Sequence, residues 1–314
     1  MNSTRTNASA SGTTQSNRNN FSVIIRVRPP LQRERHNGYF SPIIQVSPDN
    51  RSIAIMEYLG REVDEKERTK DIENNPHLAV WQAYSFDYVY DMQATQDFVY
   101  ENSAKPAVYS VLEGYNATML AYGQTGTGKT HTMEGFKYNA GDPHRGIVPR
   151  SMEEIFKFIQ MQSNSNTTFM VRASYLQIYN EVISDLLKVE RTSLMIREDR
   201  KKGVFVEGLS EWAVRSPNEI YSLMQRGALS RATATTKMND MSSRSHAVFL
   251  IIVEQMSAIG DEEDNKRFNA GLPFDEGPKQ IKVGKLNLVD LAGCERVRVT
   301  GATGKRLEES KSIN

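Results

Sequence analysis

One stretch of the chain combines glycines, a lysine and a threonine at the spacing of a phosphate-binding loop, G-x-x-x-x-G-K-T. Its residues are Gly123, Gln124, Thr125, Gly126, Thr127, Gly128, Lys129 and Thr130. Glycines let several backbone N–H groups converge on phosphate oxygens, the lysine supplies positive charge, and the threonine hydroxyl suits Mg²⁺. We therefore expect a bound nucleoside triphosphate, with Thr130 on Mg²⁺. A small-molecule kinase, a GTPase or a motor would each fit this loop alone.

Three further segments resemble motifs of the kinesin motor family. Residues 239–246, N-D-M-S-S-R-S-H, resemble its switch I, and residues 290–295, D-L-A-G-C-E, resemble its switch II. Residues 26–29, R-V-R-P, resemble the segment that the family places beside adenine. The motifs occur in the family's order, and the resemblance extends from about Phe21 to the last residue. It implies an ATPase with microtubule-based motor activity, which uses ATP and Mg²⁺ and has microtubules (tubulin) as its partner.

The resemblance also implies roles for individual groups around the phosphates. Asp290 would hold Mg²⁺ through a water molecule, and Ser243 would meet Mg²⁺ or the γ-phosphate, with Ser242 sharing that role. The backbone N–H of Gly293 would sense the γ-phosphate. At the other end of the nucleotide, Pro29 would pack against adenine with Arg28 nearby.

Arg244 and Glu295 would form an ion pair that closes over the γ-phosphate, and Glu295 would then accept the proton of the attacking water. An arginine–carboxylate pair suits this task because it is bidentate and geometrically fixed. The alternative for such a pair is a surface contact of little energetic value. Cys294 stands where the family usually has serine; because it is the only cysteine, no internal disulfide is possible. We expect the replacement to be tolerated.

Apolar segments are expected to position these motifs. A strand over 116–123 should lead into the phosphate loop, and strands over 247–256 and 282–293 should follow switch I and lead into switch II. Other strands are expected at 21–30, 42–46, 52–58, 83–90 and from 167, with a hairpin around Gly203. Helices are expected at 94–114 with a break at Pro106, after Lys129, at 150–160, and from a capping box at 216–219 with Pro217 at the first helical position. The charged segment 61–75 should be a solvated excursion. We therefore predict an α/β fold with a central mixed β-sheet, helices on both faces, and an incomplete C-terminus.

The charge balance limits the classes of partner. Lys plus Arg number 39 and Asp plus Glu number 38, so the net charge is +1, and we expect no nucleic-acid binding through bulk charge. The basic turn 199–202 is a candidate tubulin contact, with a solvated turn as the alternative. No run of residues predicts a signal peptide, membrane insertion or a structural metal. The resemblance implies a location in the cytoplasm, on the microtubule cytoskeleton.

Residues 1–20 are rich in Asn, Ser and Thr and are predicted to be a disordered tail. Residues 21–314 would form the motor domain, which lacks most of the family's relay helix and everything after it. Dimerisation would then depend on a stalk absent from this chain. We expect residues 1–314 alone to be poorly soluble or partly folded. Two other functions stay open: a truncated nucleotide-binding fragment without motor activity, and a non-motor phosphate-loop enzyme such as a nucleotide kinase.

Overall fold

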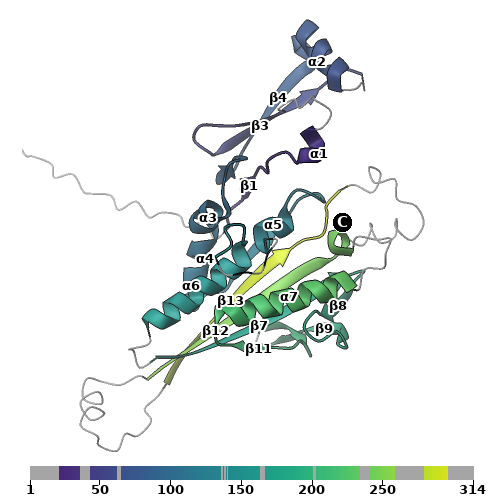
Figure 1. The fold of residues 1–314 in the computed structure, drawn as a ribbon. Coiled ribbons are helices and arrows are strands. Elements are labelled where there is room, and N and C mark those ends of the chain that lie inside the picture. Colours follow the sequence, from purple (N-terminus) through teal and green to yellow (C-terminus); the bar gives the residue numbers. More distant parts are fainter. Residues whose placement is uncertain are drawn as a thin grey trace, which may run out of the picture. The chain divides into compact units, whose positions relative to one another are not determined.

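The computed structural model describes residues 21–35, 43–61, 65–135, 137, 139, 141–162, 167–200, 203–233, 241–258 and 279–295 (Figure 1). The predicted tail, the first two residues of switch I, Lys201 and Lys202, and the segment 296–314 lie outside the described residues. Contacts divide the chain into two compact units, Met1–Gln93 and Ala94–Asn314. The single motor domain over 21–314 stays a prediction.

The first unit contains two small sheets. Strands β1 (Ile24–Arg26) and β5 (Tyr88–Tyr90) pair in parallel, while β2 (Ile44–Val46), β3 (Ser52–Tyr58) and β4 (Ala79–Ser85) form an antiparallel sheet in that order. The aromatic segment 83–90, predicted as one strand, therefore belongs to two strands in different sheets. Phe86 and Asp87 separate them: the N–H of Phe86 still donates to the carbonyl of Arg51, just before β3, whereas the N–H of Asp87 donates to the carbonyl of Val23, just before β1.

The charged segment 61–75, expected to be a solvated excursion, contains a helix, and most of its described side chains are exposed. Helix α2 occupies Glu65–Asn74, and short helices α1 (Gln32–Arg35) and η1 (Pro76–Leu78) complete the unit. Tyr58 explains part of this difference, because its hydroxyl donates to Asp71 and its ring lies 5.5 Å from the Arg68 guanidinium carbon. A polar helix without an apolar stripe is thus anchored by one aromatic residue of the preceding strand.

The second unit contains an eight-stranded sheet. Its strands run in the order β10-β9-β8-β7-β12-β13-β6, and β11 pairs with β7 outside this path. Their bounds are β6 Ala117–Ala121, β7 Thr167–Tyr179, β8 Val182–Asp185, β9 Thr192–Asp199, β10 Gly203–Glu207, β11 Trp212–Val214, β12 His246–Ala258 and β13 Lys279–Asp290. The β6–β13 pair is parallel and the other pairs are antiparallel, which confirms the predicted mixed sheet.

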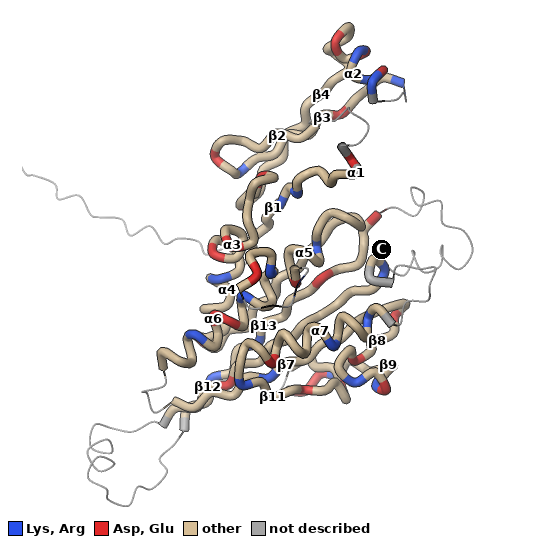
Figure 2. Tube along the Cα trace, in the orientation of Figure 1, with Lys and Arg blue, Asp and Glu red and all other residues tan. Residues whose placement is uncertain are grey.

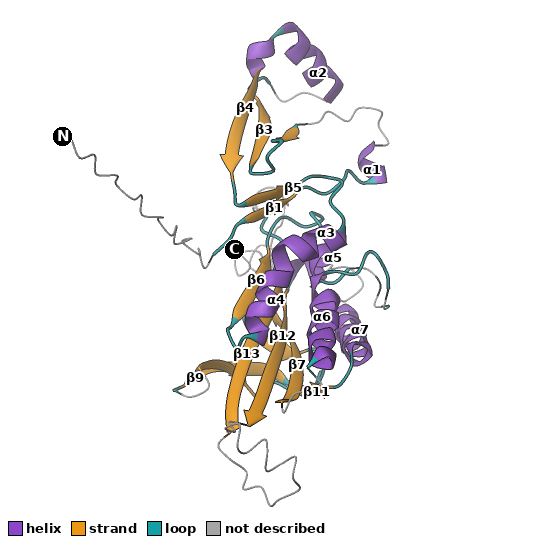
Figure 3. Cartoon of the chain, turned by 90° about the vertical axis from the view of Figure 1, so that its left-hand side faces the viewer, coloured by secondary structure: helices purple, strands orange, loops and turns teal. Residues whose placement is uncertain are grey.

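The helices of this unit lie against the sheet. The predicted break near Pro106 is present, because α3 (Gln96–Val99) passes through a π-helical turn, η2 (Tyr100–Ala104), before α4 (Lys105–Leu112) begins. The others are α5 (Lys129–Met133), α6 (Ile147–Met161) and α7 (Pro217–Thr233). Figure 3 shows α6 and α7 side by side along the sheet, and α4 packs against α6 and β13, so that the three helices share one core with the sheet. The second layer that the prediction included is not seen among the described residues.

Alternation along the long strands explains which face is buried. Phe249, Ile251 and Val253 of β12 are at most 3% exposed and face the same side as Leu286 and Leu288 of β13. They pack with apolar residues of the helical layer, which include Val108, Met152, Ile155, Ile220 and Met224. Ile220 and Met224, four residues apart, therefore lie on the buried face of α7. None of the described helices has the length and apolar character needed to cross a bilayer.

Candidate functional site

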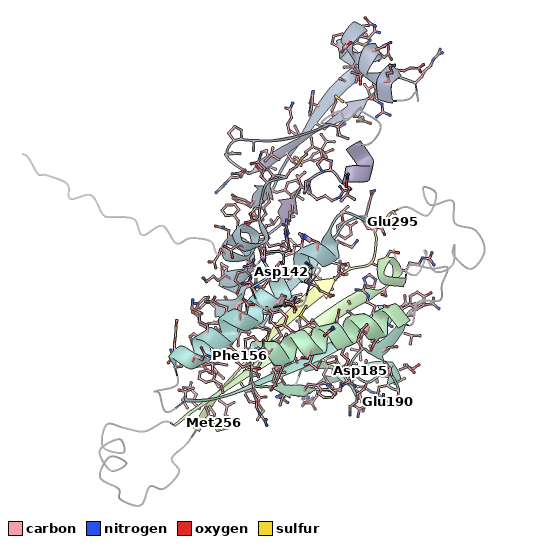
Figure 4. All side chains as sticks on the ribbon, in the orientation of Figure 1. Asp142, Phe156, Asp185, Glu190, Met256 and Glu295 are labelled. Carbon is pink, nitrogen blue, oxygen red and sulfur yellow. The ribbon has the colours of Figure 1, made fainter. Side chains whose placement is uncertain are left out.

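Strand register brings the three predicted phosphate motifs to one end of the sheet. Ala247, at the start of β12, lies opposite Asp290, at the end of β13. Asp290 also lies opposite Ala121, the last residue of β6. Because switch I precedes β12, switch II follows β13 and the phosphate loop follows β6, all three must meet there. Figure 4 places Glu295 at this end, and Met256 at the opposite end of the sheet.

The phosphate loop curls through glycines in the left-handed region. Gly126 has φ 84° and Gly128 has φ 98°, which residues with a Cβ rarely adopt. A Cβ built on either glycine would meet no atom within 4 Å, so the loop is open on that side. The Lys129 ammonium closes the loop from within, since Nζ donates to the carbonyl oxygens of Gly123 at 2.9 Å and Gln124 at 3.0 Å. This geometry leaves room for phosphate oxygens beside the glycines.

The two side chains predicted to serve Mg²⁺ are in direct contact. Thr130 Oγ1 donates to Asp290 Oδ2 at 2.6 Å. The Asp290 side chain is only 4% exposed, and Oδ1 is buried without a hydrogen-bond partner among the described residues. A buried carboxylate oxygen without a donor is costly, so it fits a site for a metal-bound water. Among the described residues, no three His, Cys, Asp or Glu side chains gather as metal ligands.

Backbone hydrogen bonds join the switch segments to each other and to the phosphate loop. The N–H of Gly293 donates to the carbonyl oxygen of Ser243 at 2.8 Å, and the N–H of Cys294 donates to that of Gly123 at 3.3 Å. Ser243 lies in the short 3₁₀ helix η3 (Met241–Arg244), which also contains Ser242 and Arg244. The Gly293 N–H, which is predicted to sense the γ-phosphate, therefore donates its hydrogen bond to switch I in this structure.

His246, the last residue of switch I, also holds switch II. Its Nδ1 accepts a hydrogen bond from the N–H of Ala292 at 3.1 Å, which requires an unprotonated Nδ1. Burial, assisted by the positive charge of Arg231, lowers the pKa of His246, and this favours the neutral ring that the contact needs. His246 therefore has a structural role, because it joins the end of switch I to the start of switch II.

The Glu295 carboxylate contacts the phosphate loop. Oε2 accepts from the N–H of Thr125 at 2.9 Å, and Oε1 accepts from its hydroxyl at 2.5 Å. Burial acts to raise the pKa of Glu295, but these hydrogen bonds and the charge of Lys129 outweigh it, so the pKa is lowered. A Cβ on Gly293 would lie 2.3 Å from Glu295 Oε2 and 2.4 Å from Thr125 Oγ1, so a larger residue there would displace this pair of side chains. The predicted pairing of Glu295 with Arg244 stays a prediction.

Arg28 and Pro29, the candidate adenine contacts, lie in the first unit directly after β1. The Arg28 guanidinium binds both carboxylate oxygens of Glu34, at 2.6 and 2.8 Å, and this bidentate pair fixes its plane. Their role toward adenine stays a prediction.

Arg231 is a residue that the sequence analysis missed. It lies in the last turn of α7 and is 6% exposed, with Nη1 3.4 Å from Asp290 Oδ2. Its position continues the buried stripe, because it comes seven residues after Met224. A charged residue at a buried helical position is the signal that could have identified it, since buried charges require partners.

Comparisons with known proteins agree with this geometry. The kinesin motor domain family model matches residues 26–314. "Kinesin-related protein 3" of Dictyostelium discoideum is 39% identical over 93% of this chain and 21% of its own length. "Kinesin heavy chain" of Neurospora crassa is 38% identical over 95% of this chain and 28% of its own length. The chain thus spans little more than a quarter of these relatives at most.

A solved structure has the same fold. It is described as "Structure of a fast kinesin: Implications for ATPase mechanism and interactions with microtubules", and it matches with a TM-score of 0.73 and 36% identity over 93% of this chain and 71% of that chain. Together with the three motifs at one end of a mixed sheet, these matches show that the chain belongs to the kinesin motor domain family.

Proposed function

We propose that this chain hydrolyses ATP and couples the reaction to movement along microtubules. The observation that supports this most directly is the set of hydrogen bonds between distant motifs. Thr130 binds Asp290, the N–H of Gly293 binds the carbonyl of Ser243, and Glu295 binds Thr125. A change at the phosphates would therefore act on both switch segments at once, as coupling of chemistry to movement requires.

Residues of the phosphate loop would hold the triphosphate, with the backbone of 123–130 around the β-phosphate. Lys129 would exchange its two carbonyl partners for phosphate oxygens. Thr130 and Ser243 would contact Mg²⁺ directly, and Asp290 would accept from a metal-bound water through Oδ1. Bound Mg²⁺ supplies positive charge that offsets charge on the transferred phosphoryl group.

Glu295 would act as the proton acceptor only after it leaves Thr125. Its lowered pKa makes it a weak base in the present position, because two donors stabilise the carboxylate. Pairing with Arg244 would draw it over the attacking water, while Gly293 would turn its N–H from Ser243 to the γ-phosphate. Closure and activation of the base would thus be one movement.

The partner follows from the relatives rather than from overall charge. Figure 2 shows Lys and Arg interspersed with Asp and Glu along the described chain, which favours local contacts over long-range attraction. The β9–β10 hairpin carries Arg200 beside the end of β9, in the predicted tubulin-contacting turn. We further propose a cytoplasmic location on microtubules.

An ATPase assay with and without microtubules tests this function. We expect phosphate release that microtubules stimulate, and we expect Lys129→Ala to abolish it because the charge at the β- and γ-phosphates is lost. Arg215→Ala, an exposed change before α7, is the matched control and should leave turnover unchanged. Turnover by Lys129→Ala equal to that of wild type would refute the site, and phosphoryl transfer to a small acceptor would indicate a nucleotide kinase instead.

One observation favours the alternative, a nucleotide-binding fragment without motor activity. Among the described strands, β6 has β13 as its neighbour and is otherwise the edge of its sheet, and its Leu120 is 59% exposed. An apolar edge strand invites intermolecular pairing. If the 314 residues bind nucleotide but show no microtubule stimulation, while a version extended by a related motor's C-terminal segment does, this alternative holds for residues 1–314.

A further inference from the structure

We propose that Arg231 is a positioning residue that orients Asp290 for Mg²⁺ and ties the end of switch I to it. Its guanidinium reaches two parts of the site. Nη1 lies 3.4 Å from Asp290 Oδ2, while Nε donates to Ser245 Oγ at 3.2 Å and Nη2 donates to the Ser245 carbonyl at 2.8 Å. One rigid group therefore joins α7, switch I and the end of β13. The proposal rests on the nucleotide and Mg²⁺ binding proposed above.

Burial makes this contact specific. Arg231 is 6% exposed, Asp290 4% and Ser245 0%, so water cannot replace a missing partner without a rearrangement. A guanidinium suits the position because its donors lie in one plane at fixed angles and can serve the carboxylate and the serine together. A lysine ammonium in the same place would keep the charge but could not span both partners in that fixed geometry.

The two carboxylate oxygens of Asp290 differ in their hydrogen-bond partners. Oδ2 accepts from Thr130 and Arg231, whereas Oδ1 has no partner among the described residues. Arg231 thereby holds the carboxylate so that Oδ1 stays available as an acceptor. When Thr130 turns to Mg²⁺, Arg231 keeps the carboxylate in the same orientation. Without Arg231 the carboxylate would rotate, and Ser245 would lose two of its contacts with α7.

Release of a fluorescent ADP analogue tests the proposal without a measurement of turnover. The chain is loaded with mant-ADP and chased with excess ATP, once with excess Mg²⁺ and once with excess EDTA. The readout is the ratio of the two release rates, because it measures how strongly Mg²⁺ retains the nucleotide. In wild type, EDTA should accelerate release clearly.

We expect Arg231→Met to reduce this ratio about tenfold, within the range reported for partners that orient metal ligands. Arg231→Lys should keep the melting temperature near that of wild type, because the buried charge is retained, yet still reduce the ratio about threefold. This second variant decides the matter if Arg231→Met does not fold. Arg226→Met is the control, because Arg226 lies on the same helix but stacks over Trp212 at 5.0 Å, and its ratio should equal that of wild type.

The outcomes separate the two proposals. If wild type binds no mant-ADP, or releases it equally fast with and without Mg²⁺, the proposed function is wrong. If wild type shows the Mg²⁺ effect and folded Arg231→Lys shows the same ratio, Arg231 supports the fold only and the positioning role is refuted. A reduced ratio in Arg231→Lys with a wild-type melting temperature supports the positioning role.

Discussion

The phosphate end of the large sheet and the small β2-β3-β4 sheet are held together in different ways. At the phosphate end, Thr125 meets Glu295 across 170 positions of the sequence and Thr130 meets Asp290 across 160. In the small sheet and its helix, Tyr58 meets Asp71 across 13 positions. The first region exists only when the whole sheet is in register, whereas local contacts hold the second. Single substitutions should therefore affect activity at the phosphate end and only local structure in the small sheet.

Glu295→Ala should have the largest effect, because it removes the proposed proton acceptor. We expect nucleotide binding to persist and turnover to fall by at least about 100-fold, because a general base typically contributes about 100-fold or more to the rate. Single-turnover phosphate release beside mant-nucleotide binding measures both. The double change Arg244→Glu with Glu295→Arg should recover more activity than either single change, since the pair is restored with reversed charges. Normal turnover by Glu295→Ala would exclude the role.

Gly227→Ala tests how tightly the elements behind the site are packed. A Cβ on Gly227 would lie 2.2 Å from Cδ1 of Tyr175, whose ring is 2% exposed and whose hydroxyl donates to the buried Glu134 at the end of α5. Overpacking lowers the free energy of unfolding by about 1–3 kcal/mol, and the better helix propensity of alanine raises it by up to about 1 kcal/mol. We expect a net destabilisation of about 1–2 kcal/mol by chemical denaturation. Ser222→Ala, exposed on the same helix, should change stability much less; an equal effect would contradict the packing explanation.

Cys294→Ser should leave ATPase activity within about threefold of wild type. The two side chains are similar in size, and the contact to the Gly123 carbonyl comes from the backbone N–H of residue 294 rather than from the thiol. The neighbouring thiol raises the pKa of Tyr122, an exposed residue whose titration the proposed mechanism does not use. Steady-state turnover measures the effect. A large loss would show that the thiol itself has a function.

Tyr58→Phe should have the smallest effect on activity, and it tests the other half of the comparison. The change removes the hydrogen bond to Asp71 but keeps the ring beside Arg68. Loss of one such bond costs about 0.5–1.5 kcal/mol, so we expect faster amide exchange in α2 with ATPase activity unchanged. A fall in turnover would mean that the two regions are more closely coupled than their contacts indicate.

The sequence by itself determined the motifs and most elements. The strands around the phosphate loop and both switches are close to their predicted bounds, because strongly apolar segments end at glycine or polar residues. The capping box predicted at 216–219 is confirmed in part. Pro217 begins the helix, but the Glu219 side chain accepts a hydrogen bond from the N–H of Arg215 rather than from that of residue 216. These strand and helix bounds could be predicted from local sequence patterns because the interactions that determine them act within a few residues.

The tertiary structure alone decided which groups satisfy one another. Pairing of Ala247 and Ala121 with Asp290 placed three distant motifs together, and no local pattern encodes a strand order. It also assigned Thr125 to Glu295 and Arg231 to Asp290, and it made a helix of the polar segment after Tyr58. The physical reason is the same each time: a buried polar group must find a partner, and only the packed fold determines which one lies within reach.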